Sequence, residues 1–270
     1  MGAGFQLDGR VVVVTGALGQ LGSAFVAALL EAGARVAALD LSDDPARART
    51  PLPQAGPERL LLLAADVTSR PSLQAALARI EAAWGPPFGL INNAAIDAPP
   101  DAPAEENGPF ETYPEGSLDR MLEVNVKGVV FCCQVFGAAM ARAGRGSIAN
   151  IASIYGLVAP DQGLYQYRRD RGEAFYKPVG YSVTKSALMN LTRYLAVYWG
   201  AKGVRVNTLT FAGVFAGQEP AFLDPYTKKV PLGRMAEPED YQGPVVFLMG
   251  DASRYMTGAN LVVDGGFTAL

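Results

Sequence analysis

The feature that most constrains the fold is a glycine-rich turn placed directly after a short, continuously apolar run. Residues 10–15 (RVVVVT) form the run, and the turn Thr15-Gly16-Ala17-Leu18-Gly19-Gln20-Leu21-Gly22 follows it. A run without polar alternation is typical of a strand buried on both faces, as in a parallel sheet. Residues 21–32 then place their apolar side chains on one helical stripe, which Gly33 is suited to end. The chain therefore begins with a predicted strand–turn–helix unit.

The same alternation continues to the end of the chain. Further buried strands are expected at residues 35–40, 60–65, 88–92, 147–152, 204–209 and 260–263. Further helices are expected at residues 72–84, 117–142, 179–202 and 237–249. Strands that alternate with helices form βαβ units and therefore a parallel sheet. Because no domain boundary or repeat interrupts the pattern, we expect one α/β domain over residues 1–270. It would be a Rossmann-type, doubly wound parallel sheet of about seven strands with helices on both faces.

Composition argues against several classes of function. The formal net charge is −3 and no block is dense in Lys or Arg, so no nucleic-acid partner is expected. The longest apolar runs are far shorter than the roughly 20 residues that span a membrane, and the first residues lack a signal-peptide pattern. We therefore expect a cytoplasmic protein without a membrane partner. The two cysteines, Cys132 and Cys133, are adjacent in an expected helix and are predicted to be buried thiols.

The chain contains no histidine. This excludes Ser-His-Asp and Cys-His catalysis and every histidine-ligated metal site, and no metal is expected. A general base must then be a tyrosine, lysine, aspartate, glutamate or cysteine.

The glycine-rich turn is suited to a dinucleotide, although a tight turn without any ligand is the alternative. Glycines allow the backbone to approach a pyrophosphate, which rests on the N–H groups at the start of the helix. Asp40 ends the second strand about 20 residues further on, where a carboxylate accepts hydrogen bonds from the adenosine ribose. It would repel a 2′-phosphate, and no arginine directly follows it, so NAD is favoured over NADP. Asp66 ends the third strand, where it either reaches the adenine or caps a turn.

A second constellation predicts acid–base chemistry. Tyr181 and Lys185 lie four residues apart on one face of an expected helix. A nearby ammonium favours the phenolate, so we expect the pKa of Tyr181 to lie below its usual value of about 10. Ser153 ends the fifth strand, where its hydroxyl can hold a substrate oxygen. Asn125, a polar residue within an apolar helix, either satisfies a local kink or relays protons.

These motifs together resemble those of the short-chain dehydrogenases/reductases, and the resemblance covers nearly the whole chain. Residues 15–22 correspond to the family's cofactor turn, Asn92-Asn93-Ala94-Ala95 to the motif after the fourth strand, and residues 257–266 to the C-terminal signature. Asn125, Ser153, Tyr181 and Lys185 fall on the catalytic tetrad. The resemblance implies NAD contacts at Gly16, Leu18, Gly19, Gln20, Leu21, Asp40, Asp66, Val67, Asn93, Ala94, Ala95, Tyr181, Lys185 and Val214.

The resemblance also implies roles. A proton would be shared among the substrate oxygen, Tyr181, the cofactor ribose and Lys185, with Asn125 ordering a water behind them. The family's assembly as a homo-oligomer, a tetramer or dimer, would use the helices at 117–142 and 179–202.

Two departures from the family pattern concern the cofactor. Gln20 stands where many members have a third glycine, and Gly19 is shifted by one position. After the sixth strand, Phe211-Ala212 replaces a usual Pro-Gly pair, although Gly213 and Val214 remain. Contacts with the nicotinamide amide are therefore expected to differ.

Two loops are expected to differ in importance. Residues 42–57 are predicted to be a mobile surface loop without a role. Residues 154–180 form a long, polar, cationic segment that emerges beside Ser153, where a long loop is often functional. Its arginines, Arg168, Arg169 and Arg171, suit a hydroxylated or anionic substrate; a solvated loop or a subunit contact is the alternative. At Ile154-Tyr155-Gly156, Ala159-Pro160-Asp161 and Lys177-Pro178, this segment loosely resembles family members of bacterial surface-sugar (nonulosonic acid) synthesis.

The leading hypothesis is an oxidoreductase that moves a hydride between NAD(H) and a secondary alcohol or ketone of a small, polyhydroxylated or anionic, sugar-type molecule. A 3-oxoacyl thioester reductase is the alternative within enzymes, and Asp40 argues against its usual NADP preference. A catalytically silent NAD-sensing protein is the alternative outside them. The intact set of acid–base residues argues against such a sensor, because binding alone does not require Tyr181 to ionise.

Overall fold

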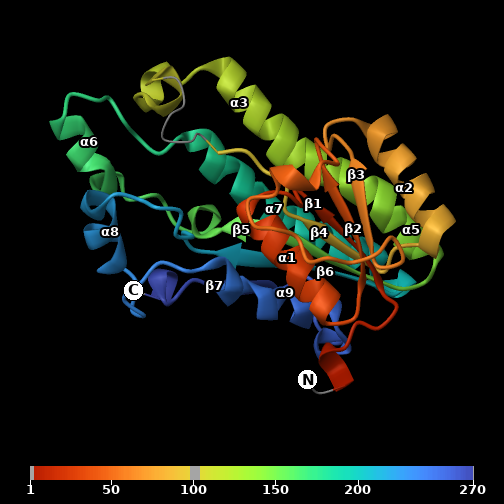
Figure 1. Cartoon of the computed structure of the whole chain (residues 1–270). Coiled ribbons are helices and arrows are strands. Elements are labelled where there is room, and N and C mark those ends of the chain that lie inside the picture. Colours follow the sequence, from red (N-terminus) through yellow and green to blue (C-terminus); the bar gives the residue numbers. More distant parts are fainter. Residues whose placement is uncertain (1–2, 98–103, 270) are drawn as a thin grey trace.

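The computed structural model describes residues 3–97 and 104–269, and its strands form one seven-stranded parallel sheet in the order β3-β2-β1-β4-β5-β6-β7 (Figure 1). The predicted fold class is confirmed. The strands are β1 (Val11–Thr15), β2 (Arg35–Asp40), β3 (Leu60–Ala64), β4 (Gly89–Asn92), β5 (Gly146–Ser153), β6 (Val204–Phe211) and β7 (Asn260–Val263).

Helices cover both faces of the sheet, and each face has its own apolar core. The side chains of β1 alternate between them: Val11 and Val13 join one core, and Val12 and Val14 join the other. All four are buried, which is why the run shows no polar alternation. The longer helices are α1 (Gln20–Glu31), α2 (Arg70–Trp84), α3 (Glu115–Leu122), α7 (Val179–Trp199) and α9 (Gln242–Met249).

The predicted helix at 117–142 is a run of several helical pieces. It consists of α3, α4 (Val129–Cys132) and α5 (Ala138–Arg142), joined by π-helical turns at Glu123–Gly128 and Cys133–Gly137. The whole run is long and apolar enough to cross a membrane, but 56% of its apolar window is buried within the fold. It is therefore the core helix of this α/β structure. Cys132 and Cys133 within it are buried free thiols, as predicted.

Two helices were not predicted, because one has only five residues and the other contains a proline, Pro225, which does not suit a helix interior. They are α6 (Gln166–Asp170) and α8 (Pro220–Thr227), which lie at the same end of the molecule (Figure 1). The segment 154–180, expected to be a long loop, therefore contains the short helix α6. Its side chains Tyr165 and Phe175 form a third apolar core with Tyr226 of α8. The predicted helix at 237–249 also begins later, because residues 238–241 form a 3-10 turn.

The strand order places a cleft at the carboxyl edge of the sheet. The chain order reverses between β1 and β4, which is where doubly wound sheets bind their ligands. A cleft of about 1290 Å³ runs from this point across the ends of β5 and β6 to α8.

Candidate active site

The glycine-rich turn at one end of the cleft is shaped by close backbone packing. Gly16 has φ +62°, and a Cβ there would lie 2.8 Å from the Cα of Ala94. A Cβ on Gly22 would lie 2.0 Å from the carbonyl oxygen of Gly16. Gly19 begins α1 without a side-chain cap, so the first N–H groups of the helix are left for a ligand. This cradle fits the pyrophosphate of a dinucleotide.

Short polar side chains hold the turn against β4. The Asn93 amide donates to the carbonyl oxygens of Thr15 and Gly16, at 3.1 and 3.0 Å. The Thr15 hydroxyl accepts from the backbone N–H groups of Asn93 and Ala94. Gln20, the departure from the glycine pattern, donates to the carbonyl of Phe215 at 2.7 Å and so joins the turn to the segment after β6.

Both predicted carboxylates lie in the cleft at the ends of their strands. Asp40 accepts from the N–H of Leu18 at 2.9 Å and from that of Leu41 at 2.8 Å, which orients it beside the glycine-rich turn. Asp66 accepts from both the N–H and the hydroxyl of Thr68 at 2.8 Å. Asp66 therefore caps a turn, as one alternative stated, and also lines the cleft.

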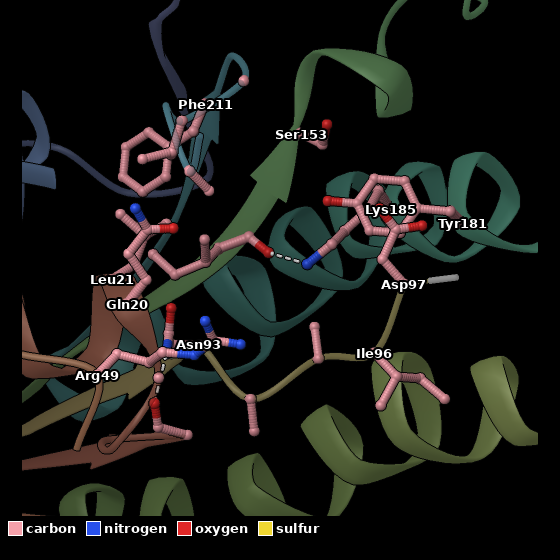
Figure 2. A pocket seen from close by; sticks show the side chains of 18 of the residues that line it. Gln20, Leu21, Arg49, Asn93, Ile96, Asp97, Ser153, Tyr181, Lys185 and Phe211 are labelled. Atoms are coloured by element: carbon pink, nitrogen blue, oxygen red, sulfur yellow. Dashed lines mark hydrogen bonds between the residues drawn. The ribbon is translucent and has the colours of Figure 1, made fainter. Parts of the chain in front are cut away.

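Residues 42–57 were predicted to be a surface loop without a role, but part of this segment lies in the wall of the cleft. Arg47 and Arg49 line the cleft together with Asp40. The N–H of Arg49 donates to the carbonyl of Leu18 at 2.9 Å, which seats this segment on the glycine-rich turn. Figure 2 shows Arg49 beside Gln20, Leu21 and Asn93. In the sequence, only an arginine directly after Asp40 was considered. This missed Arg47 and Arg49, which follow seven and nine residues later and line the same cleft as Asp40 in the folded chain.

Three of the four predicted catalytic residues meet in the middle of the cleft (Figure 2). Ser153 ends β5, and Tyr181 and Lys185 lie one turn apart on α7. The Ser153 hydroxyl accepts from the N–H of Tyr155 at 3.2 Å and lines the cleft together with Tyr181. The Lys185 ammonium donates to the carbonyl of Ile151 at 2.9 Å, and its nitrogen lies 5.7 Å from the centre of the Tyr181 ring.

The expected direction of the Tyr181 pKa is wrong for the protein without cofactor. Burial raises this pKa above its ordinary value of 10.0, and the negative charge of Asp97 raises it further, while the Ser153 hydrogen bond lowers it. Burial lowers the pKa of Lys185 to about 8. The spacing of the two residues was read correctly, but the loss of hydration on burial was not visible in it.

Asn125 is set back from the other three. It is buried in the π-helical turn at 123–128, and its side chain both accepts from the N–H of Ile96 and donates to the carbonyl of Ile96, at 2.8 and 2.9 Å. It also donates to the Thr184 hydroxyl at 3.2 Å. All these partners lie outside the helix that carries Asn125, so the contacts show neither of its two predicted roles, satisfying a local kink or relaying protons. Instead they fix the segment that leads from β4 to Asp97.

The segment after β6 is held differently from a Pro-Gly turn. Phe211 stacks on Tyr241 with ring centres 3.9 Å apart, and the Tyr241 hydroxyl donates to the carbonyl of Ala212. The N–H of Gly213 donates to the Tyr226 hydroxyl at 2.7 Å. Val214 lies in the cleft, as predicted for a cofactor contact.

The far end of the cleft is lined mainly by aromatic and apolar side chains. Sequence reasoning singled out the 154–180 segment, which supplies Tyr155, Tyr165, Tyr167 and Phe175, but missed Phe222 and Tyr226 of α8 and Met235 after it. The charged residues at this end include Asp97 and Lys177, which form an ion pair. Asp97 could have been found from its position in the sequence, directly after the motif that follows the fourth strand.

The three arginines expected to meet the substrate are engaged within the protein. Arg169 donates to the carbonyls of Phe175 and Gln162, and Arg171 pairs with Glu219 at 3.0 Å. Arg168 lines the cleft but forms an ion pair with Glu173 and stacks over Phe175.

An ordered glycine turn, an orienting carboxylate and a Ser–Tyr–Lys cluster at one sheet edge define a short-chain dehydrogenase/reductase. The family model described as enoyl-(acyl carrier protein) reductase matches residues 16–268, and the chain belongs to this family within that superfamily. Its curated relatives are named dehydrogenases, and the protein is an oxidoreductase of the alcohol/ketone type.

Three similar proteins illustrate this relationship. D-threitol dehydrogenase of Mycolicibacterium smegmatis is 36% identical, over 98% of this chain and 95% of the relative. The NAD-dependent glycerol dehydrogenase of Listeria innocua is 30% identical, over 98% of this chain and 96% of the relative. The crystal structure of a short-chain dehydrogenase from Leptospira borgpetersenii with bound NAD+ superposes with a TM-score of 0.84 at 32% identity, covering 97% of this chain and 94% of that one.

Proposed function

We propose that the protein transfers a hydride between NAD(H) and a secondary alcohol or ketone, with Tyr181 as the acid/base. The observation that carries this proposal is the meeting of Ser153, Tyr181 and Lys185 in one cleft with the glycine-rich turn. NAD, when bound, supplies or accepts the hydride. The protein's own residues then have to hold the substrate oxygen and move one proton.

The proton-handling roles follow from the geometry. Ser153 and Tyr181 line the same cleft, so a substrate oxygen placed between their hydroxyls would accept a hydrogen bond from each. In oxidation Tyr181 accepts the alcohol proton, and in reduction it donates a proton to the ketone oxygen. Lys185 is buried in the cleft, where its ammonium would favour the phenolate form of Tyr181 and would donate to a ribose hydroxyl of the cofactor.

The choice of NAD over NADP rests on Asp40. Its carboxylate is fixed by two backbone N–H groups at the edge of the cofactor cradle, where it would accept from ribose hydroxyls and repel a 2′-phosphate. The NAD-dependent glycerol dehydrogenase and the NAD+-bound structure support this assignment. Arg47 and Arg49 are the counterargument, because they bring positive charge to the same end of the cleft.

The proposed substrate is a small polyhydroxylated molecule. The threitol and glycerol dehydrogenases support a polyol, and the substrate end of the cleft combines aromatic rings with the Asp97–Lys177 ion pair. An anionic sugar is the narrower alternative, together with a place in surface-sugar (nonulosonic acid) synthesis. For that alternative, Lys177 and Arg168 are the cations in position at the substrate end.

A reductase of 3-oxoacyl thioesters is the second candidate. The description of the matching family model, enoyl-(acyl carrier protein) reductase, favours a thioester substrate. The aromatic and apolar lining of the cleft near α8 would accept an acyl chain.

We further propose a homo-oligomer, a tetramer or dimer, in the cytoplasm. Val183, Tyr194, Val197 and Tyr198 of α7 are exposed, and Tyr194 stacks on Tyr198, which supports a subunit contact along this helix. The buried free thiols of Cys132 and Cys133 are compatible with a reducing compartment.

The deciding experiment is a substrate panel scored for NADH formation. Polyols, sugars, nucleotide-linked sugars and simple secondary alcohols are offered with NAD+, and a 3-oxoacyl thioester is offered with NADH and NADPH. Turnover of a polyol with NAD+ supports the proposal, and turnover of the thioester alone supports the second candidate. NADH binding without turnover of any substrate would contradict both and favour a silent sensor.

A further inference from the structure

An ion pair at the substrate end of the cleft joins two segments that lie far apart in the chain. The Lys177 ammonium pairs with the carboxylate of Asp97, 80 residues away in sequence. The Lys177 side chain is only 12% exposed, and its nitrogen lies 4.7 Å from the centre of the Tyr181 ring. Figure 2 shows Asp97 beside Tyr181, at the end of the cleft away from Gln20 and Leu21. The pair therefore lies next to the place where the reacting carbon must sit.

Both partners are held by their backbones. The N–H of Lys177 donates to the Gln162 side chain at 2.9 Å, and that side chain donates back to the Lys177 carbonyl at 3.2 Å. On the other side, the side chain of Asn125 binds both backbone groups of Ile96, directly before Asp97. The pair is thus a fixed polar feature of the cleft wall.

Aromatic rings form much of the rest of this end of the cleft. Tyr165 packs against Phe175 and Phe222, with ring centres 5.0 and 5.6 Å apart, and Tyr155 and Tyr226 lie in the same cleft. The faces of such rings pack against the C–H groups of a substrate, whereas its hydroxyl groups need polar partners. The Asp97–Lys177 pair supplies both an acceptor and a donor for them.

We propose that Asp97 and Lys177 select substrates that carry a second hydroxyl close to the reacting carbon. Asp97 accepts a hydrogen bond from this hydroxyl, and Lys177 donates one to its oxygen. The inference rests on the proposed alcohol oxidation and assigns its substrate class: vicinal diols and longer polyols are preferred over simple secondary alcohols. A site built to bind a hydroxyl discriminates strongly against an analogue that lacks it, because the buried polar groups are then left unpaired.

The test compares Asp97→Asn and Lys177→Met with the unmodified protein on threitol and on 2-butanol. Asp251→Asn is the matched control, because Asp251 pairs with Arg10 and does not line the cleft. We expect each cleft variant to raise the KM for threitol roughly tenfold to a hundredfold, the usual effect of a lost charged hydrogen bond. The KM for 2-butanol and the affinity for NADH should stay at the values of the control. In Asp97→Asn the kcat for both alcohols is expected to change together, because the charge of Asp97 also raises the pKa of Tyr181. An equal change in the KM for both alcohols, or no change in the KM for either, would overturn the assignment of Asp97 and Lys177.

A second readout keeps the inference separate from the proposed reaction. Threitol is added to the protein–NADH complex, and the rise in Tm is measured for each variant without any turnover. We expect a rise in the unmodified protein and in Asp251→Asn, and a smaller one in both cleft variants. If the unmodified protein oxidises no alcohol but this pattern holds, the proposed reaction fails and the polyol site stands. The same rise in all variants would overturn the site even if oxidation is observed.

Discussion

The cleft has two halves, one for the cofactor and one for the substrate, and they are formed by different parts of the chain. The cofactor half consists of backbone and of short side chains at strand ends, such as the turn at Gly16 pinned by Asn93. The substrate half consists of large side chains contributed by the segment 154–180 and by α8, which pack on one another as a small separate core. The first half depends on the sheet itself, and the second on additions to it.

Because of this difference, we expect the two halves to tolerate substitutions differently. A strand end has little freedom, because every neighbouring strand fixes its position. The substrate half can change its side chains without disturbing the sheet, so one scaffold serves many alcohols. Tyr181 stands at the boundary, with its helix packed on the sheet and its hydroxyl in the cleft.

The largest effect is expected at that boundary. Tyr181→Phe removes the hydroxyl but keeps the ring, so turnover should fall about 10²–10⁴-fold while folding and NADH binding survive. Lys185→Ala should cost at least as much, and the double variant should cost much less than the product of the two losses, because both act through one proton. Steady-state turnover and NADH fluorescence titration measure these quantities. Near-normal turnover of Tyr181→Phe would contradict the mechanism.

The same residue predicts a pH dependence. Oxidation needs Tyr181 without its proton, and burial with the charge of Asp97 raises the pKa of Tyr181 above 10.0. The oxidative rate should therefore rise with pH through the alkaline range, whereas reduction, which uses the protonated form, should not require high pH. A fully developed oxidative plateau near neutral pH would show that the bound cofactor lowers this pKa.

The next largest effect is expected in the cofactor half. Gly16→Ala places a Cβ 2.8 Å from the Cα of Ala94 at φ +62°, so the turn must open and NADH affinity should fall at least about tenfold. Gly9→Ala is the matched control, since Gly9 also has a positive φ, +71°, but a Cβ there meets no atom within 4 Å and Gly9 does not line the cleft. We expect its NADH affinity to stay close to that of the unmodified protein. Equal losses in both variants would show that the turn's shape is not what binds the cofactor.

The cofactor half could be predicted from sequence because each of its signals is local. Continuous apolar runs gave all seven strands to within two residues, since buried parallel strands carry no polar side chains. Asp40 and Ser153 were found because they end such runs. Arg49 was missed because it reaches the turn only through the fold of residues 41–49.

The substrate half could not be predicted in the same way. The pairing of Asp97 with Lys177 depends on where two unrelated segments end up, and neither segment has a period that fixes its path. The raised pKa of Tyr181 depends on burial by the side chains around it. The spacing of Tyr181 and Lys185 predicts that they are neighbours on one helix, but it does not predict how deeply Tyr181 is buried.

A smaller effect is expected from the charge at the adenosine end. Asp40→Asn removes the repulsion of a 2′-phosphate, so the ratio of NADPH to NADH affinity should rise, by about tenfold for one charge-assisted contact. Arg49→Ala tests the opposing charge: if Arg49 contacts the pyrophosphate, NADH and NADPH lose affinity equally, and if it contacts a 2′-phosphate, only NADPH does. Equal or tighter binding of NADPH to the unmodified protein would contradict the assignment of NAD.

The smallest effect is expected from the arginines of the 154–180 segment. Arg171 pairs with Glu219 and both side chains are 53% exposed, so Arg171→Ala should change the KM of the identified substrate by less than about fivefold. Arg169 instead donates to the carbonyls of Phe175 and Gln162, and Arg169→Ala should lower Tm because these backbone groups lose their partner. Thermal unfolding and KM measured on both variants separate the two roles. A large rise in KM with unchanged Tm for either variant would show that the substituted arginine contacts the substrate. The substrate half would then recognise the charge of the substrate as well as the number of its hydroxyl groups.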